Sequence, residues 1–210
     1  LCSPSNPTGR VYSREEFQGL VEVLARHPQV AVQPDEIYEH IDYSGAFTSL
    51  ASFPEIVDRV AVVYGESKAY AMTGWRIGYA LANPVIIAAM TKIHQYTMLC
   101  APITAQIAAV EALRHGEKYM KNMVAEYDKR RRLIYDGLQK IGLSCFEPKG
   151  AFYIFPCIES TGMTSEDFAE KLLHSEHVAL VPGNAFGSSG EGFVRCSYAT
   201  SVANISEALV

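Results

Sequence analysis

Residues 67–79, SKAYAMTGWRIGY, contain one lysine and one arginine in an otherwise uncharged segment. The apolar run at residues 60–64 precedes this segment and ends at Gly65, which is typical of a buried strand that delivers Lys68 into a loop. Partial desolvation lowers the pKa of a lysine, and the free amine can attack an aldehyde to give a Schiff base. Arg76 would then be a permanent cation nearby. From the pattern alone, a lysine that extends along an apolar surface to water is an equal alternative.

The same segment resembles the pyridoxal-phosphate lysine motif of class I aminotransferases, the aspartate aminotransferase-like enzymes of PLP fold type I. Three further segments follow the family's order and approximate spacing: SNPTG at residues 5–9, DEIYE at 35–39 and VRCSYA at 194–199. Any one of these matches can arise by chance, whereas four in order are not expected to.

The resemblance implies an α/β fold in two parts. Residues 1–115 correspond to the C-terminal portion of the large, mainly parallel-sheet domain that binds the cofactor pyridoxal 5'-phosphate. Residues 116–210 correspond to a small α+β C-terminal domain, with Gly116 at the boundary. We therefore expect the chain to be the C-terminal part of a family member, whose first half would supply further strands and cofactor contacts.

Three residues are implied to carry the chemistry. The family's lysine bears the cofactor and then moves the substrate's α-proton, so the resemblance implies both roles for Lys68. Asp35 is expected to pair with the pyridine nitrogen of the cofactor and keep it protonated; from the residues alone, a helix cap is the alternative. Arg195 lies in an apolar strand, where a guanidinium needs an anionic partner, and the resemblance names that partner as the substrate's α-carboxylate.

Four further residues are implied to hold the cofactor. Asn6 and Tyr38 are expected to hydrogen-bond its phenolic oxygen. Arg76 is expected to pair with its phosphate, which suits a planar guanidinium, and Ser67 to assist there. Glu66 departs from the family, which often has an apolar residue at this position; an acid near a phosphate weakens binding unless it points away.

The composition of the chain argues against several classes of function. The net charge of -5 argues against a dedicated nucleic-acid surface, and no apolar run approaches the roughly 20 residues needed to cross a bilayer. The basic run at residues 129–132 is expected to be a solvated helix face. Five scattered cysteines without a C-x-x-C pair indicate free thiols in a reducing compartment, and hence the cytoplasm. His174 and His177 have no third ligand in sight, so no metal is expected.

Periodicity predicts the order of the elements. A capping box at residues 13–16 starts a helix whose buried face carries Phe17, Leu20, Val21 and Leu24. Further helices are expected at residues 84–96, 104–113, 118–141, 165–174 and from 204, and strands at 30–32, 60–64, 77–81, 143–146, 151–155, 178–181 and 193–198. The break at residues 100–102 lies near the family's subunit boundary, so the resemblance implies a homodimer.

The function implied is a PLP-dependent aminotransferase that moves an α-amino group between an amino acid and a 2-oxo acid. A β-eliminating lyase or a cyclopropane-forming synthase of the same fold shares all these residues and is the first alternative. The second is an aminotransferase-like sensor domain of a transcription regulator, with its DNA-binding part ahead of this segment. Residues 71–76, AMTGWR, are closer to the enzyme form of the motif.

Overall fold

The computed structural model describes residues 1–210 as a mixed α/β protein with two compact units. The first unit contains Leu1–Pro4 and Val11–Met123, and the second contains Ser5–Arg10 and Val124–Val210. The division at Met123 falls inside the long helix α5 (Glu117–Lys140). The domain boundary at residues 115 and 116 stays a prediction.

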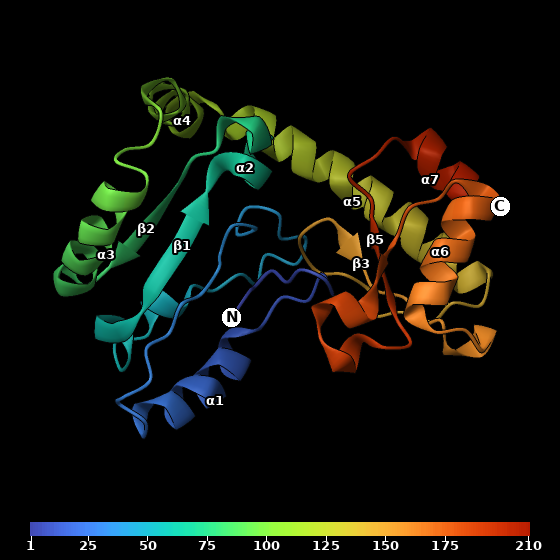
Figure 1. Ribbon diagram of the computed structural model, residues 1–210, viewed down its shortest axis with the longest axis horizontal. Helices are drawn as coiled ribbons and strands as arrows, with labels where there is room; N and C mark the ends of the chain where they lie inside the picture. The colour runs from blue at the N-terminus through green and yellow to red at the C-terminus, as the bar shows by residue number, and fades with distance from the viewer. The chain divides into compact units, whose positions relative to one another are not determined.

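The sheet of the first unit is built around β1 (Ala61–Gly65). β2 (Gly78–Ala82) pairs with it antiparallel along its whole length, from Ala61 with Ala82 to Gly65 with Gly78, and Figure 1 shows the two strands side by side. On the other edge of β1, parallel bridges join Val32 to Val60 and Asp35 to Val63. One more parallel bridge joins Asp35 to Cys2. The strands predicted at residues 60–64 and 77–81 are therefore confirmed, each shifted by one residue.

The strand predicted at residues 30–32 is wrong for its first two residues. Val30 is 40% exposed, and only Val32 reaches the sheet. The Arg59 guanidinium donates to the carbonyl oxygens of Leu24, His27 and Val30. Because a side chain takes these acceptors, the chain after the first helix stays outside the ladder until Val32.

Helix α1 (Arg14–Ala25) begins with the predicted capping box between Ser13 and Glu16. Its buried face packs in a core of residues that are at most 2% exposed. They are Phe17, Val21, Leu50, Phe53, Ile56, Val60 and Val62. Leu50 begins the 3-10 turn η1 (Leu50–Ser52). Ile56 is the residue before a second 3-10 turn, η2 (Val57–Arg59). Leu20 is 37% exposed, so its predicted place on the buried face is wrong.

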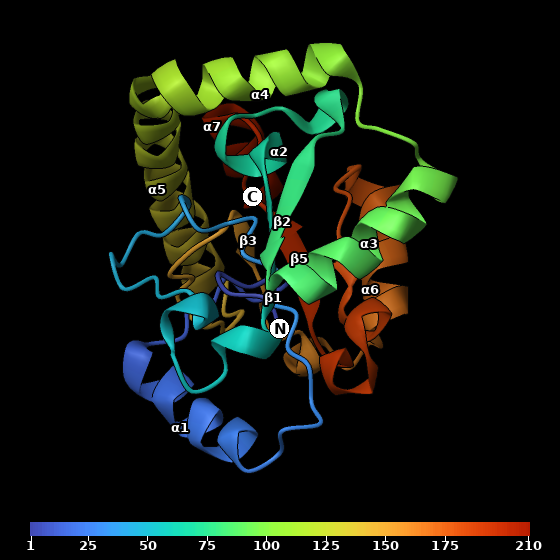
Figure 2. The same ribbon diagram turned by 90° about the vertical axis from the view of Figure 1, so that its left-hand side faces the viewer.

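Four helical segments lie between β1 and α5 in the first unit. They are α2 (Glu66–Ala69), the 3-10 turn η3 (Thr73–Trp75), α3 (Pro84–Thr97) and α4 (Ile103–His115). Asn83 caps α3 by accepting a hydrogen bond from Val85, and α3 lies beside β2 in both views (Figure 1 and Figure 2). The predicted break is present between α3 and α4, where Leu99 has a positive φ of 64°. None of the helices in the chain combines the length and apolar character needed to span a bilayer.

The second unit has a three-stranded antiparallel sheet in the order β3-β5-β4. Its strands are β3 (Tyr153–Ile154), β4 (Val181–Pro182) and β5 (Val194–Ser197), and its helices are α6 (Ser165–Glu176) and α7 (Val202–Ala208). These elements confirm the predicted order, with shorter strands. The strand predicted at residues 143–146 is absent, because Leu143 donates back to Leu138 at the end of α5 and only Ser144 accepts a backbone hydrogen bond from a neighbouring segment.

The basic run on α5 is not a uniformly solvated face. Arg131 is 7% exposed and donates to Asp128 at 2.8 Å, to Glu147 at 2.6 Å and to the Pro148 carbonyl oxygen at 3.0 Å. The prediction of a solvated face is therefore wrong at Arg131. It holds for Arg132, whose side chain is 68% exposed.

Candidate active site

Asp35 lies at the end of a short parallel ladder in the first unit. Its backbone N–H donates to Leu1 at 2.7 Å, and the next N–H, that of Glu36, donates to Val63 at 3.0 Å. The Asp35 side chain is exposed at this edge, where Oδ1 accepts from the Ile37 N–H at 3.2 Å. Val63 is near the C-terminal end of β1, so Asp35 and the segment after β1 leave the sheet at the same edge, where open α/β sheets place ligands.

Lys68 is held in a single helical turn directly after β1. Gly65 is the N-cap of α2, and the Tyr70 N–H closes the turn by donating to Glu66 at 3.1 Å. Ala69 and Met72, at 3% and 6% exposure, anchor the segment on either side of this closing residue. Lys68 and Ser67 are both half-buried. The backbone of Lys68 is therefore part of a helical turn in which Glu66 and Ala69 are buried.

Arg76 lies at the end of the same connection. It adopts the left-handed conformation with φ 53°, and its Nη1 donates to the Thr73 carbonyl oxygen at 3.0 Å while the residue stays exposed. The pairing of Gly65 with Gly78 closes the connection that carries both Lys68 and Arg76. At Gly78 a Cβ would lie 2.7 Å from the Tyr64 carbonyl oxygen, so the close approach of the two strands requires glycine there.

Glu36 is a structural residue that the sequence analysis missed. Its carboxylate is 2% exposed and accepts from Ser49 Oγ at 3.0 Å, from the Leu50 N–H at 3.1 Å and from Tyr64 Oη at 2.8 Å. Burial, together with the Glu36 carboxylate, raises the pKa of Tyr64. These bonds fix the turn that follows Asp35 and contains Tyr38, which is 4% exposed. The only signal for this role in the sequence is that Glu36 directly follows Asp35, a predicted site residue.

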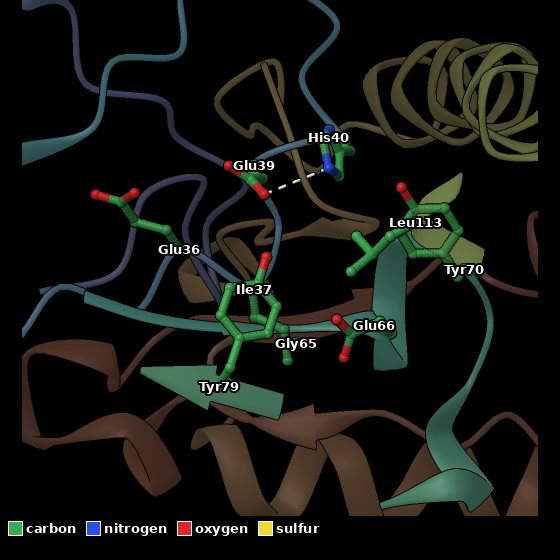
Figure 3. A pocket seen from close by; sticks show the side chains of 9 residues that line it. All are labelled: Glu36, Ile37, Glu39, His40, Gly65, Glu66, Tyr70, Tyr79 and Leu113. Carbon is green, nitrogen blue, oxygen red and sulfur yellow. Dashed lines mark ion pairs between the residues drawn. The ribbon is translucent and has the colours of Figure 1, made fainter. Parts of the chain in front are cut away.

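Glu66, the departure from the family pattern, is buried at 2% exposure. It lines a small cavity in the first unit together with Glu39, His40, Tyr70 and Tyr79, among others (Figure 3). One of its oxygens, Oε2, is buried without a hydrogen-bond partner.

Arg195 is the centre of a separate cluster in the second unit. Its Nη1 donates to Asn6 Oδ1 at 2.8 Å. The guanidinium lies 4.5 Å from the ring centroid of Tyr153 and 5.0 Å from that of Phe186. Its Nε is buried and has no acceptor. A guanidinium with an unsatisfied N–H between two aromatic rings is suited to a planar, bidentate anion such as a carboxylate.

The loop that carries Asn6 is fixed by backbone bonds within the second unit. Ser5 donates to Arg10 at 2.8 Å, and both Lys149 and Gly150 donate to the Gly9 carbonyl oxygen. Asn6 therefore faces Arg195 through its Oδ1, and its amide nitrogen is the donor that the sequence resemblance assigns to the cofactor.

The predicted site residues thus fall into two groups. Asp35, Tyr38, Ser67, Lys68 and Arg76 belong to the first unit, and Asn6 and Arg195 belong to the second. The first group belongs to the segments that leave the sheet at the end of β1, and the two residues of the second group are joined by a hydrogen bond. Their roles toward a cofactor and a substrate stay predictions.

The fold of this chain is similar to those of solved aminotransferases. The solved aromatic aminotransferase from Pyrococcus horikoshii OT3 matches 99% of this chain with a TM-score of 0.95 and 43% identity, and the chain covers 56% of it. A mutant aspartate aminotransferase from Thermus thermophilus matches the whole chain with a TM-score of 0.92 and 38% identity, and the chain covers 54% of it. The fold is therefore that of the PLP fold type I enzymes, as predicted.

The family model "Aminotransferase class I and II" matches residues 1–210. The chain belongs to the class I and II aminotransferase family. It is 53% identical over its whole length to a putative aminotransferase, YugH, from Bacillus subtilis, and 42% identical to an aspartate aminotransferase from Pyrococcus abyssi. In both comparisons it spans about half of the relative, 54% of its length.

Proposed function

We propose that the protein containing this chain moves an α-amino group between an amino acid and a 2-oxo acid. The observation that carries the proposal is the parallel bridge between Asp35 and Val63, which brings an exposed acid and the lysine turn after β1 to one edge of a sheet. An acid and an amine at one such edge suit chemistry on a heteroaromatic aldehyde. Membership of the aminotransferase family supports the same conclusion.

Pyridoxal 5'-phosphate is the cofactor that these residues fit. When bound, it supplies an aldehyde that condenses with amines and a ring that accepts electrons from a substrate carbanion. The Asp35 carboxylate would accept the N–H of the ring nitrogen, and Tyr38 and Asn6 would hydrogen-bond the phenolic oxygen. The exposed Arg76 guanidinium uses one donor on Thr73 and offers the rest of its planar fork to a phosphate, with Ser67 beside Lys68.

The substrate's α-carboxylate would be bound by Arg195. The buried Nε is a donor without an acceptor, and leaving such a group unpaired costs about 1–3 kcal/mol. A carboxylate would satisfy it. Asn6 on one side and the rings of Tyr153 and Phe186 restrict the directions in which the guanidinium can point. All amino acids share this carboxylate, so the contact would orient the substrate without selecting its side chain.

Lys68 would hold and move the substrate's α-proton. Its backbone lies in a helical turn directly after β1, between the buried residues Glu66 and Ala69. A positioned acid or base of this kind contributes typically about 10²–10⁴-fold to a rate.

The experiment that tests this function is product analysis with the full-length protein, pyridoxal 5'-phosphate, and a panel of amino acids and 2-oxo acids. Transfer predicts a new amino acid in a one-to-one ratio with a consumed 2-oxo acid. Pyruvate with free ammonia would instead identify an elimination, and no turnover with any pair would contradict the proposal.

We also propose that the full-length protein is a cytoplasmic homodimer. The five cysteines of this chain are all free thiols, which supports a reducing compartment. The dimer is inferred from the family resemblance at the break between α3 and α4. Light scattering coupled to size-exclusion chromatography of the full-length protein tests it, and a monomer at micromolar concentration would contradict it.

A further inference from the structure

The Glu66 carboxyl group is in an unusual environment for an acid. It is 2% exposed, its Oε2 has no hydrogen-bond partner, and it lies two residues before Lys68. A buried carboxylate without a donor or cation is costly. No lysine or arginine lines this cavity or the larger open pocket that Glu66 also lines. The group therefore needs a donor that is not a cationic side chain of these linings.

Glu39 lies on the same cavity and comes from the turn that follows Asp35 (Figure 3). Burial, and then the negative charge of Glu36, raise the pKa of Glu39 to about 7. Its Oε1 lies 3.3 Å from His40 Nε2. Glu39 therefore holds a proton over much of the range in which an ordinary glutamate has lost it.

The cavity has the size for one water molecule. Its volume is about 10 Å³, close to the minimum that holds a single water. A water there needs two or more polar partners, and the lining offers carboxyl groups from Glu39 and Glu66 and phenol groups from Tyr70 and Tyr79.

We propose that a water molecule in this cavity links Glu39 to Glu66, and that this link fixes the turn carrying Lys68 to the turn that follows Asp35. Glu39 and Glu66 are then positioning residues. Protonated Glu39 donates to the water, and the water donates to Glu66 Oε2. The water-mediated bond adds to two contacts that already join these segments to each other or to β1: the ring contact between His40 and Tyr70, and the hydrogen bond from the Glu36 N–H to Val63. The consequence for Lys68 rests on the proposed function, but the link itself does not.

None of the other titratable groups around the cavity supplies a strong positive charge to it. Glu36 faces Glu39 from the same turn but already accepts three hydrogen bonds. Burial lowers the pKa of His40, with Glu117 at the start of α5 opposing that change, so His40 is a weak source of positive charge. Burial, followed by the charges of Glu39 and Glu66, raises the pKa values of Tyr70 and Tyr79, which therefore stay neutral donors. Tyr64 on β1 already donates its hydroxyl hydrogen to Glu36.

The sign of the pH effect follows from the raised pKa of Glu39. Its folded-state pKa of about 7 lies above the ordinary value of 4.5. The stability contributed by its proton is fully present below pH 4.5 and is lost progressively as the pH rises from 4.5 to about 7. Above that pH, Glu39 no longer donates a proton to the water.

The test uses the full-length protein and compares Glu39→Gln, Glu66→Gln and the double variant at pH 5.5 and 8.5. The matched control is Glu22→Gln, which removes one charge from an exposed position on α1. Glutamine mimics a protonated glutamate, so Glu39→Gln should raise Tm at both pH values, by about 2–4 °C more at pH 8.5 than at pH 5.5. In the Glu66→Gln background this gain should fall by at least half, and Glu22→Gln should keep the wild-type pH dependence.

Amide hydrogen exchange tests the positioning of Lys68 separately. Protection of residues 66–70, corrected for intrinsic exchange, should fall between pH 5.5 and 8.5 in the wild type and stay constant in Glu39→Gln. Equal pH dependence in Glu39→Gln and Glu22→Gln would overturn the titration of Glu39. If Glu39→Gln raises Tm equally in the wild-type and Glu66→Gln backgrounds, the link is overturned. If the protection of residues 66–70 does not change with pH in the wild type, the link has no effect on the turn of Lys68.

Two controls keep these outcomes interpretable. If Glu66→Gln does not fold, Glu66→Leu provides the same comparison with an apolar residue. Neither Tm nor exchange depends on turnover, so a protein that transfers no amino group would contradict the proposed function while these measurements still decide the link.

Discussion

Arg195 Nη1 donates a 2.8 Å hydrogen bond to Asn6 Oδ1, which joins two residues 189 positions apart in the chain. The bond fixes one end of a guanidinium whose Nε has no acceptor and whose faces contact Tyr153 and Phe186. Because the loop of Asn6 belongs to the same compact unit as β5, this geometry is a property of the second unit alone. A substitution that keeps the positive charge of Arg195 but changes the shape of its side chain should therefore still disturb this contact.

Arg195→Lys keeps the positive charge and loses the planar fork. We expect kcat/KM to fall by about 10- to 100-fold for every amino acid tested, since a hydrogen bond to a charged group contributes about 1.5–3 kcal/mol. Arg26→Lys, at an exposed position after α1, is the control and should change little. A loss confined to acidic amino acids would show that Arg195 recognises the side chain instead.

Lys68→Ala should remove both the visible absorbance of the lysine-bound cofactor and most of the turnover. The rate should fall by at least about 10²–10⁴-fold, because a positioned acid or base contributes that much. Absorbance spectra and single-turnover kinetics measure the two effects. Lys118→Ala, exposed on α5, serves as the control, and near-normal turnover in Lys68→Ala would exclude Lys68 from the chemistry.

Asp35→Asn should preserve the turn, because an asparagine oxygen can still accept from the Ile37 N–H. Cofactor should still bind, whereas removal of the substrate's α-proton should slow, since a neutral amide does not hold the ring nitrogen protonated. Rates with α-deuterated and ordinary amino acids measure this step. An unchanged rate and isotope effect would contradict the role of Asp35, and Asp58→Asn on the surface provides the comparison.

Local signals in the sequence predicted the elements whose stabilising contacts are also local. The capping box of α1 joins Ser13 to Glu16, and the left-handed residue at the α3–α4 break lies next to the predicted Cys100. The motif containing Lys68 predicted a strand followed by a turn, and both are present. The family and the fold class followed from four such motifs in order.

Contacts between distant segments could not be predicted from the sequence. The buried carboxylate of Glu36 depends on hydrogen bonds donated by Ser49, Leu50 and Tyr64, which are 13 to 28 residues away. Burial of Glu66 likewise depends on the elements that surround its cavity. No pattern of residue types within one helix or strand contains this information, which is why both acids were missed as structural residues.

Arg131→Ala should destabilise the protein far more than Arg132→Ala, although the two residues are neighbours in one basic run. Arg131 is 7% exposed and pairs with Asp128 and Glu147, so we expect its removal to cost about 2–3 kcal/mol of unfolding free energy. The exposed Arg132 pair should contribute less than about 1 kcal/mol. Urea unfolding of both variants measures the difference, and equal costs would contradict the buried role of Arg131.

The same ion pair predicts the direction of a pH effect. Hydrogen bonds from Arg131, and then from Lys149, lower the pKa of Glu147 below its ordinary value of 4.5. A lowered folded-state pKa contributes stability that is present above pH 4.5 and is lost as the pH falls below it. Urea unfolding between pH 3 and 6 should therefore show a smaller loss of stability on acidification in Arg131→Ala than in Arg132→Ala.

Gly9→Ala should weaken the second unit and, through it, the contact between Asn6 and Arg195. Gly9 has a positive φ of 69°, and a Cβ there would lie 2.6 Å from Pro148 Cβ and 2.7 Å from the Tyr153 carbonyl oxygen. The left-handed conformation and the overpacking together should cost about 2–4 kcal/mol. Gly19→Ala is the matched control: it lies in the exposed middle of α1 with open space around it, and it should stabilise the protein by about 0.5–1 kcal/mol. Since the Asn6 loop would shift, kcat/KM should also fall in Gly9→Ala and stay unchanged in Gly19→Ala; equal stability of the two variants would show that the loop accommodates the extra methyl group.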